Sequence, residues 1–110
     1  MQRDFGPTAY LLASQRNGTL YVGVTSDLLG RIYKHRHGLV PGFTRDYGVK
    51  LLVWFEQHAT METAIGREKR IKKWNRAWKL ELIEASNPDW CDLAEQLGLE
   101  PLAGFPLSRE

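Results

Sequence analysis

The chain has very little cysteine, no long hydrophobic run and few acidic residues in its first three quarters. Cys91 is the single cysteine among 110 residues, which excludes an internal disulfide and a cysteine zinc site. A reducing cytoplasm is the setting that this predicts. The longest uncharged apolar run, 51–55, is too short to cross a bilayer. The first residues lack the apolar region of a secretion signal, so we expect the chain not to be exported.

Length and composition are those of one small globular domain. The 110 residues fit one modest core, and 43% hydrophobic with 25% charged residues is ordinary for such a domain. The net charge of +2 hides an asymmetry. Residues 1–80 hold 14 Lys and Arg against 6 Asp and Glu, whereas residues 81–110 hold 1 against 7.

The positive charge is densest between residues 64 and 80. A basic helix suits a polyanion such as DNA, because phosphate contacts supply most of the binding energy. A solvated helix face with no ligand is the alternative interpretation. The cations of this stretch are Arg67, Lys69, Arg70, Lys72, Lys73, Arg76 and Lys79, and Glu68 is its one acidic residue.

The first part of the chain reads as a β-hairpin. Residues 9–13 and 19–24 are apolar and alternating, and the Asn17-Gly18 pair between them is a strong turn signal. With a loop of two or four residues, Tyr10 and Tyr21 share one face of the hairpin. Leu11 and Val22 then share the other face, which we expect to meet the core.

The remaining elements alternate between helix and strand. Ser26 can cap a helix over 27–37 that Gly38 ends, and 49–57 reads as a buried third strand. Thr60 can cap a helix that runs to residue 73, a break follows at 74–75, and a further helix reaches residue 85. A short acidic helix is expected over 90–97. The order ββαβαα predicts an α+β fold, with a small, largely antiparallel three-stranded sheet flanked by helices. We expect one domain over 1–85 and an acidic C-terminal extension over 86–110.

Glu68 carries the sharpest chemical signal. Met61, Ala64, Ile65 and Ile71 recur at helical spacing, and position 68 falls on the same stripe. A carboxylate there is costly to bury unless it is paired or binds a metal ion. An ion pair with Arg31, or a place at the edge of the stripe, are the alternatives.

Arg31 and His35 stand four residues apart, so they project together from one side of their helix. Arginine can hold a phosphate oxygen and offset charge in a transition state. Histidine can bond a phosphate or orient a neighbouring tyrosine or water. A surface arginine and a bystander histidine are the plain alternatives, and Tyr10 and Tyr21 are ordinary strand aromatics by default.

Taken together, these positions resemble a known family. Tyr10 and Tyr21 lie 11 residues apart, Arg31 follows by 10 and His35 by 4, with Glu68 in the basic helix. Thr8-Ala9-Tyr10 stands where the GIY-YIG nucleases have Gly-Ile-Tyr, and Tyr21-Val22-Gly23 where they have Tyr-Ile-Gly. The chain resembles the small single-domain, excinuclease-C-like (UPF0213-type) branch of that family. Thr8-Ala9 in place of Gly-Ile is the one departure, and it leaves the tyrosine in place.

The resemblance implies a fold and a set of catalytic residues. It implies the GIY-YIG endonuclease fold over roughly residues 7–85, with Glu68 as the single protein ligand of Mg²⁺ or Mn²⁺. Arg31 and His35 would stabilise charge on the phosphate, and one of the two tyrosines would help to activate the attacking water. Half-ionising a phenol at pH 7 needs a pKa shift of roughly three units, or about 4 kcal/mol. The family resemblance slightly favours Tyr10 as the base, and the spacing favours neither tyrosine.

Further residues are candidates for DNA contact. Gly23 leaves space beside Tyr21, which we interpret as room for the substrate backbone. Trp74 and Trp78 are four apart and fit helix packing better than base stacking. The candidates for DNA binding are Thr25, Lys34, Arg36, Lys69, Lys72, Lys73, Asn75 and Arg76.

The sequence therefore predicts a metal-dependent DNA endonuclease. A chain of this size lacks room for a separate DNA-reading domain, so we expect recognition of DNA structure, such as branches, flaps or single strands, and a link to repair or recombination. A membrane is not an expected partner. Two alternatives stay open. One is a non-catalytic nucleic-acid-binding module. The other is an interaction protein whose acidic tail docks a protein partner or covers its own basic face.

Overall fold

A three-stranded antiparallel sheet forms the centre of the protein, with strand order β2-β1-β3. The structure is a computed structural model that describes residues 6–40 and 42–99. Its strands are β1 (Thr8–Ala13), β2 (Leu20–Thr25) and β3 (Leu51–Gln57). The helices are α1 (Leu28–Arg36), α2 (Phe43–Asp46), α3 (Met61–Lys73), α4 (Arg76–Ser86) and α5 (Leu93–Gln96). The predicted α+β class and the ββαβαα order are confirmed, and α2 is a helix that the sequence did not predict.

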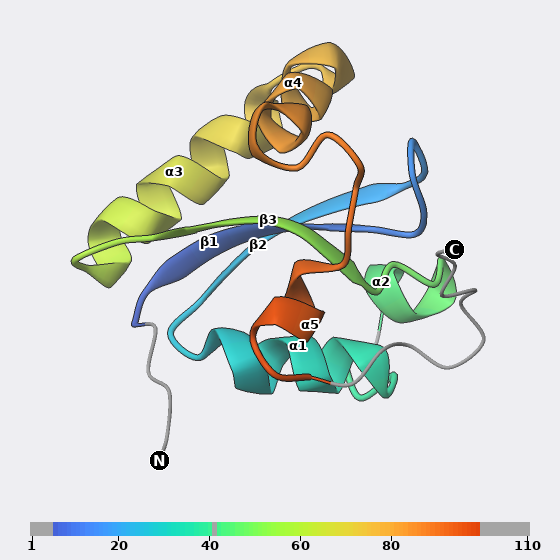
Figure 1. The fold of residues 1–110 in the computed structure, drawn as a ribbon. Coiled ribbons are helices and arrows are strands. Elements are labelled where there is room, and N and C mark those ends of the chain that lie inside the picture. The colour runs from blue at the N-terminus through green and yellow to red at the C-terminus, as the bar shows by residue number, and fades with distance from the viewer. Residues whose placement is uncertain (1–5, 41, 100–110) are drawn as a thin grey trace.

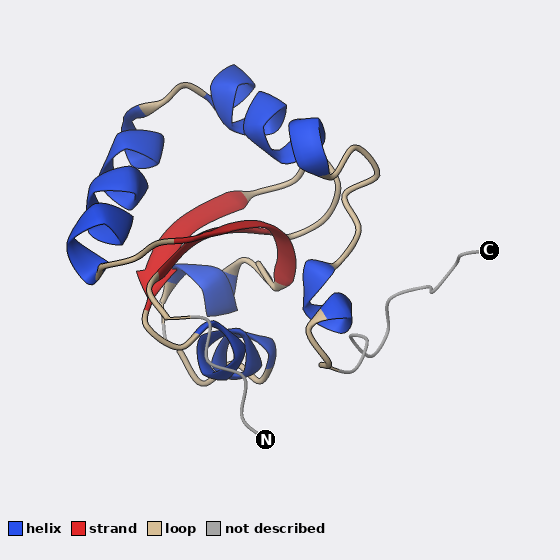
Figure 2. Ribbon diagram, turned by 60° about the vertical axis from the view of Figure 1, so that its left-hand side comes forward, coloured by secondary structure: helices blue, strands red, loops and turns tan. Residues whose placement is uncertain are grey.

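Helices cover both faces of the sheet. Figure 1 shows α3 and α4 on one face and α1 and α5 on the other, and Figure 2 shows the same layers from the side. Every residue of β1 is buried. A central strand with both faces covered needs a nearly continuous apolar sequence, and the segment TAYLLA is one. The expectation of a single core-facing side is therefore incomplete, because the tyrosine face is buried as well.

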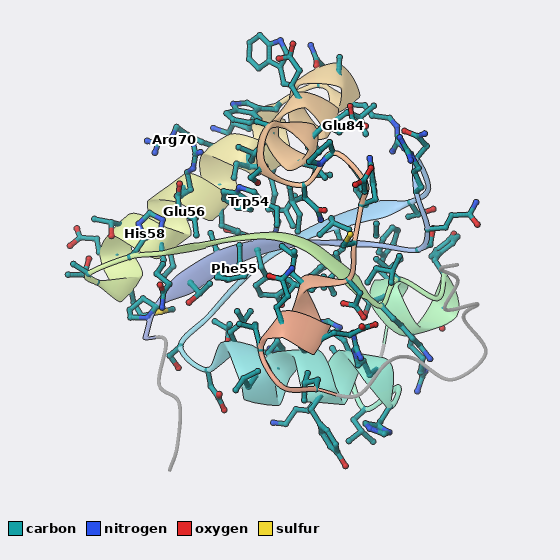
Figure 3. The ribbon with its side chains drawn as sticks, viewed as in Figure 1. Trp54, Phe55, Glu56, His58, Arg70 and Glu84 are labelled. Atoms are coloured by element: carbon teal, nitrogen blue, oxygen red, sulfur yellow. The ribbon has the colours of Figure 1, made fainter. Side chains whose placement is uncertain are left out.

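The hairpin has the register that the sequence predicted. Tyr10 lies opposite Gly23, and Leu12 lies opposite Tyr21. Residues opposite each other in a sheet share a face, so both tyrosines point to the side of α1. The adjacent side chains Trp54 and Phe55 of β3 show the same alternation. Trp54 points toward α3 and Phe55 away from it (Figure 3).

Side-chain caps set where the helices begin. Thr60 caps α3 as predicted, accepting a hydrogen bond from the amide of Thr63 at 3.2 Å. For α1 the prediction was wrong by one residue, because Asp27 rather than Ser26 is the cap. The Asp27 carboxylate accepts from the amide of Gly30 at 3.1 Å. It stands directly before the first helical residue, which is the position from which a short side chain reaches the free amides of the first turn.

The chain beyond α4 packs onto the sheet. The Asn87 side chain donates to the carbonyls of Val53 at 3.1 Å and Cys91 at 2.9 Å. Trp90 is buried on the α4 side of the sheet and Ala94 on the α1 side. Residues 86–99 of the predicted acidic extension thus share the core of the domain, and residues 100–110 lie outside the described residues. The predicted acidic helix is found as α5.

A buried ion pair joins α1 to this C-terminal segment. Arg36 pairs with Asp92, and their side chains are only 6% and 7% exposed. Asp92 also accepts from the amides of Leu52 and Ala94. Arg36 was predicted to contact DNA, and this prediction is corrected, because a guanidinium held inside the protein is not offered to a phosphate.

We expect Asp92→Asn to destabilise the protein by about 3 kcal/mol, because it leaves the Arg36 charge buried without its counterion. Asparagine keeps an oxygen for the amides of Leu52 and Ala94, so the loss of stability reports the missing negative charge alone. The control is Asp46→Asn, which breaks an exposed pair with Arg45 at 3.8 Å and should cost less than about 1 kcal/mol. Urea unfolding of both variants measures the difference, and equal stability of the two would contradict the prediction.

Candidate active site

Three rings from three elements meet on the α1 side of the sheet. The ring centroids of Tyr10 and Tyr21 are 6.4 Å apart, and His35 lies 6.1 Å from Tyr10 and 5.7 Å from Tyr21. The hairpin register sets the two tyrosines, and α1 brings the histidine over them. Residues that are far apart in the sequence therefore form one cluster.

A chain of hydrogen bonds runs through this cluster. The Tyr10 hydroxyl lies 3.2 Å from His35 Nε2, and His35 Nδ1 lies 3.0 Å from the Thr44 hydroxyl. Tyr10 is 1% exposed and His35 2%. A neutral imidazole has one donor and one acceptor nitrogen, so the two hydroxyls satisfy the whole ring. Thr44, on α2, is a residue that the sequence did not single out, since it matches no motif and lies between the helix predicted over 27–37 and the strand predicted over 49–57.

Burial keeps both groups neutral. It raises the pKa of the Tyr10 phenol above 10, and the nearby Tyr21 and Glu68 raise it further while Arg31 lowers it. Burial lowers the pKa of His35 from 6.5 to about 4, and the positive charge of Arg31 adds to this effect. At neutral pH the pair is therefore an uncharged phenol bonded to an uncharged imidazole.

Gly23 provides the space for Tyr10. A Cβ atom at position 23 would lie 2.5 Å from the Tyr10 hydroxyl and from Cζ of its ring. Such a contact is far shorter than carbon and oxygen atoms tolerate. The prediction that Gly23 leaves room for the substrate backbone is therefore corrected, because the Tyr10 phenol occupies this space.

Glu68 and Arg31 complete the cluster. Glu68 is buried on α3, and its carboxylate binds the ammonium of Lys72 at 2.6 Å. Among residues 6–40 and 42–99 no ion pair joins Glu68 to Arg31, so the predicted alternative of such a pair is not found. The Glu68 carboxylate is close enough to act on the pKa of Tyr10, and the Arg31 charge acts on both Tyr10 and His35. All five residues of the predicted catalytic set thus gather at one place.

The Lys72 ammonium shows that Glu68 attracts a cation. The lysine is 54% exposed, and its hydrogen bond to the carboxylate raises its pKa. Carboxylate oxygens are the hard ligands that Mg²⁺ and Mn²⁺ prefer, and a single carboxylate with water and substrate phosphate is a normal Mg²⁺ shell. Within residues 6–40 and 42–99, no group of three or more His, Cys, Asp or Glu could hold an ion. Glu68 therefore fits a divalent ion only in this single-carboxylate mode.

Arg67 holds α3 against the sheet. Its guanidinium stacks over the rings of Trp54 and Trp74, at 5.7 and 5.5 Å from their centroids, and its Nε donates to Glu56 at 3.1 Å. The same carboxylate pairs with His58 (Figure 3). These contacts set the position of the neighbouring Glu68. Sequence reasoning missed this role of Arg67, since only the packing of α3 on β3 brings its guanidinium over Trp54 and Trp74.

Several predicted DNA contacts have structural partners. The Asn75 side chain caps α4 by accepting from the amide of Trp78 at 2.9 Å. The Arg76 guanidinium donates to the carbonyls of Asn17 and Gly18 at 2.8 and 2.7 Å and so ties α4 to the hairpin turn.

The other candidates for DNA contact fall into two groups. The Thr25 hydroxyl is buried and accepts from the amide of Asp27 at 3.0 Å. Lys34 on α1 and Lys69 and Lys73 on α3 are exposed. These three lysines, with Lys72, stay candidates for phosphate contact.

Two aromatic residues that sequence reasoning also missed, Phe43 and Tyr47, extend the ring cluster from Tyr21. The rings of Tyr21 and Phe43 stack with centroids 6.4 Å apart, and Phe43 lies 4.8 Å from Tyr47. Both new residues belong to the stretch around α2. Their spacing of four would have been a signal if a helix had been predicted there.

Comparison with known proteins defines the class. Residues 7–81 match the family described as "GIY-YIG catalytic domain". This match covers more than half of the chain and includes all five gathered residues, so the protein belongs to the GIY-YIG family. No helix of residues 6–40 and 42–99 has the length and apolar character of a membrane span.

The most similar relatives that we compared belong to one branch of the GIY-YIG family. A UPF0213 protein of Staphylococcus epidermidis is 34% identical over 68 residues, covering 62% of this chain and 83% of that one. A UPF0213 protein of Clostridium perfringens is 38% identical over 72 residues, covering 66% and 77%. The solution NMR structure of the UPF0213 protein BH0048 from Bacillus halodurans superimposes with a TM-score of 0.50 at 26% identity, covering 86% of this chain and 98% of that one. The chain thus matches the small UPF0213 branch that the sequence predicted.

We expect the His35 imidazole to titrate near pH 4 rather than near 6.5. Because its folded pKa lies below its unfolded value, the unfolded chain binds more protons in this window, and stability falls as pH falls from about 6.5 to 4. Histidine ring signals followed by NMR from pH 7.5 to 3.5 measure the pKa directly. A midpoint near 6.5 would show that the buried hydrogen-bond chain is not formed.

Proposed function

We propose that this protein is a metal-dependent endonuclease that hydrolyses phosphodiester bonds in DNA, selects its substrates by structure, and serves DNA repair or recombination. The observation that carries the proposal is the gathering of Tyr21, Arg31, His35 and Glu68 at one place, with Tyr10 beneath them. Membership of the GIY-YIG family supports phosphodiester hydrolysis as the chemistry.

Tyr21 is the better candidate to take a proton from the attacking water. The sequence slightly favoured Tyr10, but the Tyr10 phenol is buried, has a raised pKa and is bonded to His35. A buried phenol with a raised pKa is a poor proton acceptor. Tyr21 is only half-buried, so its hydroxyl stands where substrate and water can reach the cluster.

Arg31 would stabilise the negative charge that develops on the phosphoryl oxygens, and His35 would support the site that positions it. A guanidinium can hold two phosphate oxygens at once and stays charged at any working pH. His35 is neutral and already satisfied by two hydroxyls, so its main contribution is to hold Tyr10 and the end of α1 in place. Positioned donors of this kind are typically worth two to three powers of ten in rate, roughly.

Glu68 would hold one Mg²⁺ or Mn²⁺, with water and substrate phosphate as the other ligands. Such an ion supplies Lewis-acid polarisation of the phosphate and stabilises the leaving oxygen. Lys72 occupies the carboxylate in the structure, and its exposed side chain can turn toward a phosphate when an ion replaces it. The exposed lysines 34, 69 and 73 would add sequence-independent attraction to the DNA backbone.

We expect Glu68→Gln to lower Mg²⁺-dependent cleavage by a hundredfold or more, roughly, and to leave DNA binding within about twofold, since the lysines remain. The matched control is Glu62→Gln, which removes an exposed carboxylate from the first turn of the same helix and should behave as wild type. The assay is cleavage of single-stranded, duplex, flap and junction DNA with Mg²⁺, Mn²⁺ or EDTA.

Two outcomes of this assay would overturn parts of the proposal. Glu68→Gln activity equal to that of Glu62→Gln would eliminate the metal-ligand role. A wild-type protein that binds DNA but cleaves none of the four substrates would instead favour a non-catalytic nucleic-acid-binding module, which the basic α3 also suits.

The two tyrosines should respond differently to loss of the hydroxyl. Tyr21→Phe should slow cleavage by about a hundredfold and remove an ionisation from the pH–rate profile, as expected for a general base. Tyr10→Phe removes the bond to His35 Nε2 and should keep more activity while lowering the melting temperature. Rates measured on one substrate from pH 6 to 10 separate the two. The reverse order of effects would assign the base to Tyr10.

A further inference from the structure

The short helix α2 presents two faces with different functions. Thr44 points inward and bonds His35, while Phe43 and Tyr47 are 46% and 62% exposed. Their spacing of four places the two rings side by side, with centroids 4.8 Å apart. Large aromatic side chains are normally drawn into a core, so an exposed adjacent pair calls for another explanation.

The exposed pair is continuous with the active site. The Phe43 ring stacks on Tyr21 with a centroid distance of 6.4 Å and an interplanar angle of 28°. Tyr21, Phe43 and Tyr47 thus form a row that leads from the proposed catalytic tyrosine to the protein surface. We define these three side chains as the aromatic row.

The chemistry of the row suits a nucleobase. Bases stack favourably on exposed aromatic rings whatever the sequence, because every base has a π-face. In a duplex the base faces are already stacked, so only an unpaired nucleotide offers its faces.

We propose that Phe43 and Tyr47 stack the unpaired bases next to the scissile phosphate, so that the substrate is DNA with a single-stranded segment, such as a flap or a free strand. This rests on the proposed nuclease function, since the row is placed by its contact with Tyr21. A protein partner is the competing occupant. Continuity with the catalytic cluster, through the stacking of Phe43 on Tyr21, favours the nucleotide.

The test compares binding of single-stranded and duplex DNA by the full chain. Fluorescence anisotropy in EDTA prevents cleavage, and the probes are a labelled 12-nucleotide oligothymidine and a duplex of equal length. Phe43→Ala/Tyr47→Ala should weaken oligothymidine binding by tenfold or more, and duplex binding by less than about twofold. Tyr33→Ala removes an exposed aromatic of α1 that lies outside the row and should change neither.

Three further measurements separate stacking from phosphate contacts and from a structural effect. Phe43→Trp keeps a stacking ring and should bind oligothymidine at least as well as wild type. The fold loss of Phe43→Ala/Tyr47→Ala should persist at high salt, whereas a loss of phosphate contacts shrinks as salt rises. An unchanged His35 titration would show that Thr44 and α2 are still in place.

The possible outcomes distinguish this inference from the nuclease function. Unchanged oligothymidine binding by Phe43→Ala/Tyr47→Ala, or an equal loss on duplex, would overturn the stacking role, even in a protein that cleaves DNA. Selective loss on oligothymidine would support stacking even if no substrate were cut, and the nuclease proposal alone would then fail.

Discussion

The bond between Tyr10 and His35 is the contact on which the arrangement of the site depends. It lies under the sheet, where a polar group without a partner would cost on the order of 1–3 kcal/mol. The imidazole must therefore find two partners, and it finds them in the Tyr10 hydroxyl and the Thr44 hydroxyl. The two hydrogen bonds of His35 thereby connect α1 to β1 and to α2.

Two other features follow from this contact. Position 23 has to be glycine, because any larger residue would occupy the space of the Tyr10 phenol. The inward face of α2 is fixed by Thr44, which leaves its outward face free for Phe43 and Tyr47. The bond to His35 also explains why the two tyrosines differ in burial. Tyr10 is held and neutral, whereas Tyr21 remains at the border between the buried cluster and the surface.

The positive side chains fall into two groups, arginines with structural partners and lysines that are exposed to solvent. Arg36 is paired inside the protein with Asp92, Arg67 stacks between two tryptophans, and Arg76 ties α4 to the hairpin. Each of these guanidiniums has a planar set of donors that a structural partner can use fully. The lysines differ, since most of them remain exposed, and they make up the surface that is available to phosphate.

The order of the elements, the antiparallel hairpin and the common face of the two tyrosines could be predicted from the sequence. These features depend on local periodicity, on the Asn17-Gly18 turn and on whether the loop has an even or odd number of residues. All three are set by residues that lie close together in the sequence. The family pattern also picked out the five residues that gather at the site. The Glu68–Lys72 pair is also local, because its two residues stand four apart on one helix. The partner of Arg36 was decided only by the tertiary structure, because Asp92 lies on a distant segment that packing brings beside α1. The same holds for Thr44 and Phe43, whose four-residue helix is too short to give a periodic signal and whose positions are set by His35 and Tyr21 from other elements.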